Sequence, residues 1–130
     1  RKSANTRRII NENKLIPILK NYGFISYELE KISEREKIDL FINAEFVIGT
    51  FGGGLSNIIY SEKLNILEIF PERYAGHNYF QLASILGFNY KFMVGKNYKN
   101  DCNYKDSDIL LNVEYFENII KSWDFSKNNF

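Results

Sequence analysis

The sequence holds one cysteine, one histidine and no long apolar run, and each shortage excludes a class of protein. The single thiol, Cys102, cannot form an internal disulfide, and we interpret it as a loop thiol without a redox role. It lies 25 positions from His77, which is no zinc spacing, so we expect no metal site. No stretch approaches the roughly 20 apolar residues of a membrane span. We therefore expect no span in this segment and a cytoplasmic location, with any membrane association carried by other parts of the protein.

The chain also lacks an excess of charge of either sign. Its 17 basic and 16 acidic residues give a net charge of +1, so no overall field attracts nucleic acid. Basic residues gather only at the start, at Arg1, Lys2, Arg7 and Arg8. A nucleic-acid-binding module is therefore the third-ranked hypothesis, and we expect no nucleic-acid partner.

What remains is the composition of a globular protein. With 130 residues and 45% hydrophobic content, the chain is expected to form a single domain, residues 1–130, with a real core. The Asn- and Lys-rich tail, residues 124–130, is expected to fray. Because the numbering opens on Arg in a basic polar segment, we expect this domain to be a piece of a longer protein.

Apolar spacing predicts helices that alternate with short apolar strands. Asn11 is a candidate N-cap, Pro17 predicts a helix start near Lys14 or a kink, and Ser33 with Glu36 forms a capping-box pattern. We expect helices over 11–21, 33–44, 55–60, 79–86 and 112–123, strands over 24–29, 46–49, 65–70 and 89–94, and a surface loop over 95–108. Such alternation is typical of an α/β fold, a mostly parallel sheet with helices on both faces in three layers.

The most distinctive stretch runs from Glu45 to Asn57. An apolar strand ends at Gly49, the glycines Gly52, Gly53 and Gly54 follow, and Ser56-Asn57 opens a helical segment. Backbone N–H groups of such a turn can approach an anion closely, and the helix dipole adds positive charge there. The spacing is neither a dinucleotide fingerprint nor a P-loop. A flexible loop or a packing point is the alternative interpretation.

Several segments together resemble a known family. They are Arg1-Lys2 with Arg7 to Glu12, Tyr22-Gly23-Phe24, Phe41 to Ala44, Ile48 to Asn57 and Ile66 to Pro71. Their ordered succession, over roughly residues 1–95, is similar to the carboxyl-terminal part of family 61 glycosyltransferases, whose bacterial members are associated with capsular polysaccharide biosynthesis. The resemblance implies a Rossmann-like half of a two-domain GT-B enzyme. Such an enzyme binds a nucleotide sugar and passes the sugar to a glycan acceptor without a metal or another cofactor.

The resemblance also has one clear departure. Family members carry the pattern Gly-x-His-Gly-Ala-Gly-Leu-Thr-Asn, and this chain has Phe51 at the histidine position. The change removes a group that could carry a proton or a hydrogen bond beside the turn. The resemblance further implies that an amino-terminal domain of the same protein supplies much of the acceptor site, so the segment alone is expected to be inactive.

The candidate donor-binding residues follow from the turn, from side-chain chemistry and from the resemblance. Guanidinium groups can offset the charge of a diphosphate leaving group, and the resemblance favours Arg8 over Arg7. Glu68 interrupts an apolar strand, so its carboxylate must be paired, hydrogen bonded or at an open end, and the resemblance suggests a role on ribose hydroxyls. The full set is Arg7, Arg8, Asn11, Gly52, Gly53, Gly54, Ser56, Asn57 and Glu68.

Alternatives stay open at these positions. A solvated basic loop, a helix cap at Asn11 and an ion-paired Glu68 would each explain the residues without a ligand. His77 could act as a base, but a surface or capping role fits it better, and no catalytic residue is assigned. The first hypothesis is a nucleotide-sugar-dependent glycosyltransferase domain, with the nucleotide unassigned. The second is a non-catalytic partner domain that keeps the fold and has lost turnover.

Overall fold

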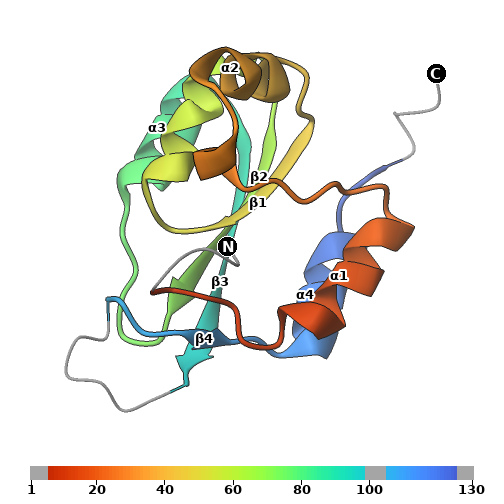
Figure 1. The fold of residues 1–130 in the computed structure, drawn as a ribbon, viewed down its shortest axis with the longest axis vertical. Helices are drawn as coiled ribbons and strands as arrows, with labels where there is room; N and C mark the ends of the chain where they lie inside the picture. The colour runs from red at the N-terminus through yellow and green to blue at the C-terminus, as the bar shows by residue number, and fades with distance from the viewer. Residues whose placement is uncertain (1–5, 99–104, 126–130) are drawn as a thin grey trace.

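The fold is a mixed α/β arrangement built on one curled, mostly parallel sheet. The computed structural model describes residues 6–98 and 105–125 of the chain. Its four strands follow one another in the order β1 (Phe46–Thr50), β2 (Asn65–Pro71), β3 (Asn89–Asn97) and β4 (Ile109–Leu110). β1, β2 and β3 run parallel, and the short β4 pairs antiparallel with the end of β3 (Figure 1).

β2 is the central strand of the parallel part. Its register places Ile48 and Phe46 of β1 beside Leu67 and Asn65. Six of its seven residues are buried, from Ile66 to Pro71. A continuous apolar run of this kind suits a strand that is covered on both faces, and its interior position explains why it carries almost no polar residues.

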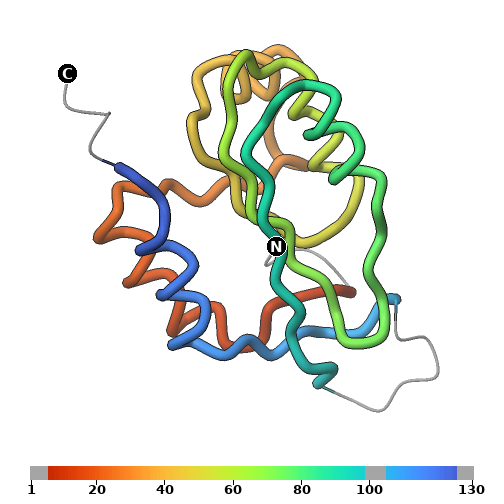
Figure 2. The backbone as a smooth tube through the Cα atoms, turned by 180° about the vertical axis from the view of Figure 1, so that it is seen from behind, coloured from red at the N-terminus to blue at the C-terminus, as the bar shows by residue number. Residues whose placement is uncertain are grey.

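The helices pack on this strand from two sides. They are α1 (Glu12–Asn21), α2 (Glu34–Ile42), α3 (Asn78–Leu86) and α4 (Val113–Lys121), with the 3₁₀ helices η1 (Leu29–Lys31) and η2 (Gly53–Tyr60). One core cluster joins Leu67 and Ile69 to residues of α1 and α4, which lie side by side in Figures 1 and 2. The other joins Ile66 to residues of α2, η2 and α3. Alternate residues of β2 therefore serve two apolar clusters.

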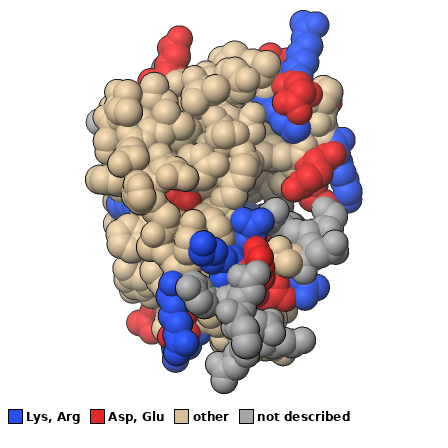
Figure 3. All heavy atoms as spheres, turned by 90° about the vertical axis from the view of Figure 1, so that its left-hand side faces the viewer, with Lys and Arg blue, Asp and Glu red and all other residues tan. Residues whose placement is uncertain are grey.

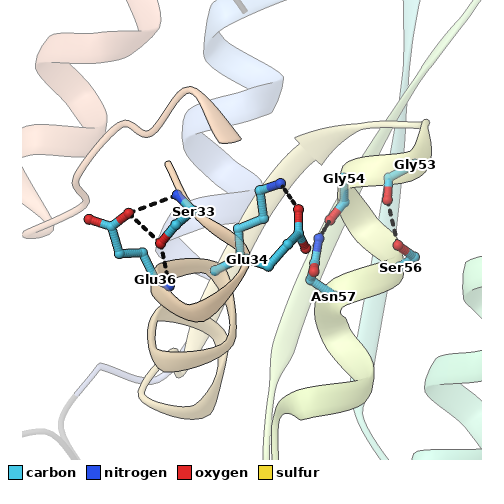
Figure 4. A network of polar contacts seen from close by, with 8 residues as sticks. Ser33, Glu34, Glu36, Gly53, Gly54, Ser56 and Asn57 are labelled. Carbon is cyan, nitrogen blue, oxygen red and sulfur yellow. Dashed lines mark hydrogen bonds and ion pairs between the residues drawn. The ribbon is translucent and has the colours of Figure 1, made fainter. Parts of the chain in front are cut away.

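Local signals in the sequence place most helix ends correctly. The Ser33 hydroxyl accepts a hydrogen bond from the Glu36 amide while the Glu36 carboxylate accepts one from the Ser33 amide, which confirms the predicted capping box (Figure 4). Asn112 caps α4 through a 2.8 Å bond from the Tyr115 amide. Gly23 and Gly87, at φ +78° and +73°, end α1 and α3 as predicted.

The predicted strand over residues 24–29 is wrong. Residues 24–28 have no regular structure in the described chain, and Leu29 begins η1. A strand needs a neighbour to satisfy its backbone, and its propensity depends on that pairing. No neighbouring strand lies beside this segment among the residues that the structure describes.

Two other expectations also need correction. The helix predicted over 11–21 forms as α1 and continues through Pro17. Of the two alternatives at Pro17, the later start near Lys14 is wrong, because α1 begins at Glu12. Asn11 occupies the N-cap position, but its amide instead pairs with the backbone of Leu111, donating to the carbonyl at 2.8 Å and accepting from the N–H at 3.1 Å. Its side chain therefore ties the start of α1 to the end of β4.

Some predictions fall outside or at the edge of the described residues. Arg1, Lys2 and Cys102 lie outside them. β3 extends to Asn97, so the predicted loop over 95–108 begins later than expected. Of the predicted tail, the structure describes residues 124 and 125, and the Phe125 ring packs 4.7 Å from that of Phe46.

Charged side chains are unevenly spread over the face that Figure 3 shows. Lys, Arg, Asp and Glu gather mainly in its lower half and at its edge, while a broad uncharged surface covers the upper part (Figure 3). Within the described ranges, no helix combines the length and the apolar character needed to cross a bilayer.

Candidate functional site

The glycine turn joins the carboxyl end of β1 to η2. Because β1, β2 and β3 are parallel, their carboxyl ends meet at one edge of the sheet, and the turn lies there. Gly52 has φ +150°, a conformation that L side chains rarely adopt, so glycine is required at this position. The sequence predicts a helix that starts at residue 55, but η2 begins two residues earlier, at Gly53. Its first turn therefore contains Gly53 and Gly54.

Side chains of η2 hold the turn in shape from within. Ser56 Oγ donates to the Gly53 carbonyl at 2.6 Å, and Asn57 Nδ2 donates to the Gly54 carbonyl at 2.9 Å (Figure 4). Both side chains point back along their own helix, so in this structure they stabilise the turn. The N–H groups at the very start of a helix have no partner within it, and the turn can bind an anion through such groups. The Leu55 amide is not one of them, because it donates to the Gly52 carbonyl.

Tyr79 of α3 fastens the turn to the rest of the domain. Its hydroxyl donates to the Gly52 carbonyl at 2.8 Å, a carbonyl that also accepts from the Leu55 amide at 3.1 Å. The pKa of the Tyr79 hydroxyl is raised by burial and by the nearby charge of Glu68, so it remains a donor. No local pattern in the sequence relates residues 27 positions apart, so this contact could not be predicted from the sequence.

Arg7 lies over Phe51, next to the turn. The guanidinium carbon is 4.9 Å from the centroid of the Phe51 ring, and Nη1 reaches the Phe51 carbonyl at 3.5 Å. Asp106 lies 3.8 Å from the Arg7 Nε. Arg7 adopts φ +59°, an uncommon conformation for a residue with a side chain. Phe51 therefore supports a cation beside the turn, a role that the sequence did not suggest.

The aromatic stack extends beyond Phe51. Its ring lies 4.7 Å from Tyr74 and 5.8 Å from Phe70, and Lys105 Nζ lies 5.4 Å from the Tyr74 ring. Two cations thus flank an aromatic group at the carboxyl edge of the sheet. Tyr74 itself packs against the rings of Phe51 and Phe70 in this arrangement.

Arg8 is engaged elsewhere. Its guanidinium contacts the Asp108 carboxylate through three hydrogen bonds, the shortest of them 2.6 Å, and its backbone N–H donates to the same carboxylate at 2.9 Å. The partner raises the pKa of Arg8 still further. This ion pair, like the pairing of Asn11 with Leu111, connects the start of the described chain to β4.

Glu68 lies inside the protein with a hydrogen-bond partner. The residue is 2% exposed, and its carboxylate accepts a 2.6 Å hydrogen bond from the Tyr90 hydroxyl of β3. This pairing satisfies the requirement, drawn from the sequence, that a carboxylate in a central strand be hydrogen bonded. Burial raises the pKa of Glu68 above its usual range, although the bond from Tyr90 opposes the shift. Its direct contact with a ribose remains a prediction.

Glu68→Gln should change how stability depends on pH. Because the pKa is higher in the folded state, the stability that Glu68 contributes is fully present below about pH 4.5, its ordinary value, and is lost as pH rises through the folded-state pKa. Gln keeps an acceptor for Tyr90 and carries no charge. The melting temperature of the variant should therefore rise relative to the wild type between pH 4 and neutral pH.

The matched control for this measurement is Glu62→Gln, at an exposed position. Its melting curve should run parallel to the wild type over the same range. Parallel curves for Glu68→Gln as well would show that burial leaves the Glu68 carboxyl unperturbed.

A cavity of about 840 Å³ reaches the turn from the side of β1. Of the predicted donor-binding residues, Arg7, Gly52 and Gly54 line it. Arg8, Asn11, Gly53, Ser56, Asn57 and Glu68 are not among its lining residues. The tertiary structure thus brings Arg7 and the glycine turn to one end of a cavity and gives several other candidates structural partners.

His77 is the remaining titratable candidate from the sequence, and it lies outside the site described above. His77 is exposed at the N-cap position of α3 and makes no side-chain cap. No group of three or more His, Cys, Asp and Glu side chains that could hold a metal occurs within residues 6–98 and 105–125.

Comparison with known proteins decides the family. The family model of glycosyltransferase 61 matches residues 1–66, which is more than half of the 130 residues. The chain belongs to the glycosyltransferase 61 family. The match covers α1, α2, β1, the glycine turn and η2, so Arg7 and the glycine turn lie within the matched region, whereas Glu68 and Tyr79 lie outside it. No curated protein and no solved structure matches this chain.

Membership connects this family 61 domain with glycosyl transfer in general. That reaction requires a sugar donor and an acceptor. Of the residues at the site, Arg7, Phe51 and the three glycines all fall inside the matched region.

Proposed function

We propose that this family 61 domain binds the nucleotide part of a sugar donor for transfer of the sugar to a glycan. The observation that carries the proposal is the pairing of two anion-binding elements: the glycine turn at the carboxyl edge of the sheet and the Arg7 guanidinium, held 3.5 Å from the carbonyl of Phe51 beside it. Family membership supplies the reaction class.

The chemistry of transfer explains why such elements would be useful. When the bond between the sugar and the diphosphate breaks, negative charge develops on the departing phosphate oxygens. N–H groups, a helix dipole and a guanidinium stabilise that charge most when they are already in place. Here Tyr79 and Ser56 hold the turn, and Phe51 supports the cation, so little reorganisation is needed.

The proposal includes the finer features that the resemblance implies. We infer a three-layer Rossmann-like domain that forms the carboxyl-terminal half of a GT-B enzyme, active without a metal in bacterial polysaccharide or capsule biosynthesis. The acceptor glycan would then lie between this domain and an amino-terminal domain of the same protein, on the cytoplasmic side. In this scheme the Gly53 N–H contacts the diphosphate and Glu68 contacts the ribose hydroxyls. Ser56 and Asn57 hold the turn, while Arg8 and Asn11 anchor the start of the described chain beside β4.

A second candidate function is a non-catalytic partner domain. Phe51 favours it, because the aromatic ring packs between Arg7 and Tyr74 and has no proton to give. Sugar transfer by the complete protein would exclude this candidate. Nucleotide binding without transfer would support it.

Calorimetric titration of the complete protein with UDP, GDP and CMP tests the proposed donor site. Saturable binding of one of them is expected. Failure of all three to bind would overturn the donor-binding proposal and leave the family assignment in place.

Arg7→Ala should weaken binding of whichever nucleotide binds by about 10- to 100-fold, since a hydrogen bond to a charged group contributes about 1.5–3 kcal/mol. Arg8→Ala is the matched control, because Asp108 already occupies that guanidinium. The control should leave affinity nearly unchanged. Equal losses in both variants would contradict the separate roles of the two arginines.

A further inference from the structure

β3 keeps an unpaired hydrogen-bonding edge along most of its length. The Asn89 amide donates to the Leu64 carbonyl at the start of β2, so alternate residues from Asn89 onward bond to β2. The N–H and C=O groups of Tyr90, Phe92 and Val94 therefore point away from β2. β4 pairs only with the last two residues of β3, so no strand of the described chain lies opposite these three residues.

Exposed apolar side chains follow the same edge. Phe92 is 56% exposed and Val94 is 46% exposed. Side chains alternate along a strand, so both lie on the same sheet face as Tyr90, whose ring contacts Phe80 of α3. The exposed apolar side chains of this face, which we call the β3 row, are Phe80, Phe92, Val94, Tyr98 and Leu110.

The edge lacks the features that usually protect an exposed strand. Proteins block such edges with a proline, a bulge or a charged side chain. β3 contains no proline, and its register with β2 is unbroken from Asn89 to Gly95. Lys91 lies on the opposite face, where its ammonium group donates to Ser122, and Lys96 lies where β4 already covers the edge. An apolar edge of this kind needs a cover in the working protein.

The edge is complementary to itself. When two copies of β3 lie antiparallel about a twofold axis at Phe92, each Phe92 amide meets the Phe92 carbonyl of the second copy, and the groups of Tyr90 meet those of Val94. The side chains then form Phe–Phe and Tyr–Val neighbours, which are favourable cross-strand pairs. A twofold pairing also closes the assembly, because it uses the edge of both copies.

The area of the β3 row fits a small dimer. An aromatic side chain has about 150–250 Å² of surface, so the exposed fractions of the row leave about 500 Å² of mainly apolar surface in water per copy. Two copies together offer about 1,000 Å², which is the lower bound for a specific protein–protein interface. A dimer of this size is expected to dissociate in the micromolar range.

We propose that the protein forms a symmetric dimer in which β3 of each copy pairs antiparallel with β3 of the second copy, centred on Phe92. The parallel strands of the two copies then run in opposite directions through one continuous sheet. The two glycine turns therefore lie at opposite edges of that sheet, and each stays open. The dimer does not depend on the proposed function.

Sedimentation of the complete protein between about 1 and 300 µM tests the dimer. The wild type should pass from monomer to dimer over this range. Phe92→Lys should weaken the dimer by about 100-fold or more, because the symmetry places the substitution twice at the centre of the interface. Ile42→Lys, at an exposed position of α2, is the matched control and should leave the dimer unchanged. Val94→Glu serves as the second variant if Phe92→Lys does not fold.

Amide hydrogen exchange locates the pairing within β3. Rising protein concentration should slow exchange at Tyr90, Phe92 and Val94 by about tenfold or more. Lys91 and Met93, whose amides already point to β2, should change little.

Cysteine cross-linking tests the register, with Cys102 replaced by serine in each variant. Phe92→Cys should form a disulfide between copies, because paired residues at the axis lie about 5.5 Å apart between their Cα atoms. Val94→Cys should not, because its two copies would lie about 14 Å apart.

Three outcomes would overturn the proposal. They are a monomer at every concentration, a dimer that persists unchanged in both Phe92→Lys and Val94→Glu, and equal cross-linking of the two cysteine variants. A monomer whose Tyr90, Phe92 and Val94 amides are protected at every concentration would assign the edge to another segment of the same protein. Nucleotide titration is independent of these results, so the dimer and the donor site can fail separately.

Discussion

Gly53→Asp is expected to reduce nucleotide binding by roughly 100-fold or more, because it places a negative charge where a phosphate would bind. A Cβ at Gly53 meets no atom within 4 Å, so the side chain has room. An acidic side chain in the first turn of η2 also interacts favourably with the helix dipole. The stability of the domain should therefore stay the same or rise. Calorimetry with the nucleotide that binds, together with thermal melting, separates the two effects.

Gly53→Asn is the matched control, since it is nearly the same size and carries no charge. Its affinity should fall by no more than about tenfold, and only the Asp variant should recover affinity as salt increases. Equal losses in both variants would show a steric effect. Unchanged binding by Gly53→Asp would place the diphosphate elsewhere.

Gly95→Ala is expected to destabilise the domain by about 2–3 kcal/mol, which lowers the melting temperature by roughly 10 °C. A Cβ at this position would lie 2.3 Å from Cγ2 of Ile109 and 2.7 Å from Cδ2 of Leu111. Both side chains are buried, and the Leu110 carbonyl stands 3.0 Å away, so little can move. Thermal or urea unfolding measures the change.

Gly53→Ala makes the same chemical change in open space and should leave the melting temperature within about 2 °C of the wild type. Comparing the two variants therefore separates the effect of losing a glycine from the effect of steric overlap with Ile109 and Leu111. A normal melting temperature for Gly95→Ala would mean that β4 shifts away from β3 at little cost.

Elements that depend on local chemistry could be predicted from the sequence. The capping box at Ser33, the left-handed residues Gly23 and Gly87, and the apolar run of β2 all act within a few residues. Phe24–Glu28 has the same kind of local signal and nevertheless forms no strand. Its state depends on a neighbour, and the described chain provides none.

The same distinction between neighbouring and distant residues applies to the candidate site. The glycine turn after β1 was evident from its spacing, and parallel pairing places it at the carboxyl edge. The partners of the turn come from distant residues: Tyr79, 27 positions from Gly52, and Arg7, 44 positions from Phe51. The family resemblance favours Arg8, but Asp108, 100 positions away, binds that side chain.

By itself, the sequence determined the helix caps, the central apolar strand and the position of the glycine turn. These features follow from backbone conformation and from the spacing of apolar residues, which are properties of neighbouring residues. Only the tertiary structure decided which arginine lies at the turn, that Phe51 contacts its guanidinium, and that Glu68 pairs with Tyr90. Each of these depends on how distant segments pack, and packing is a property of the whole chain.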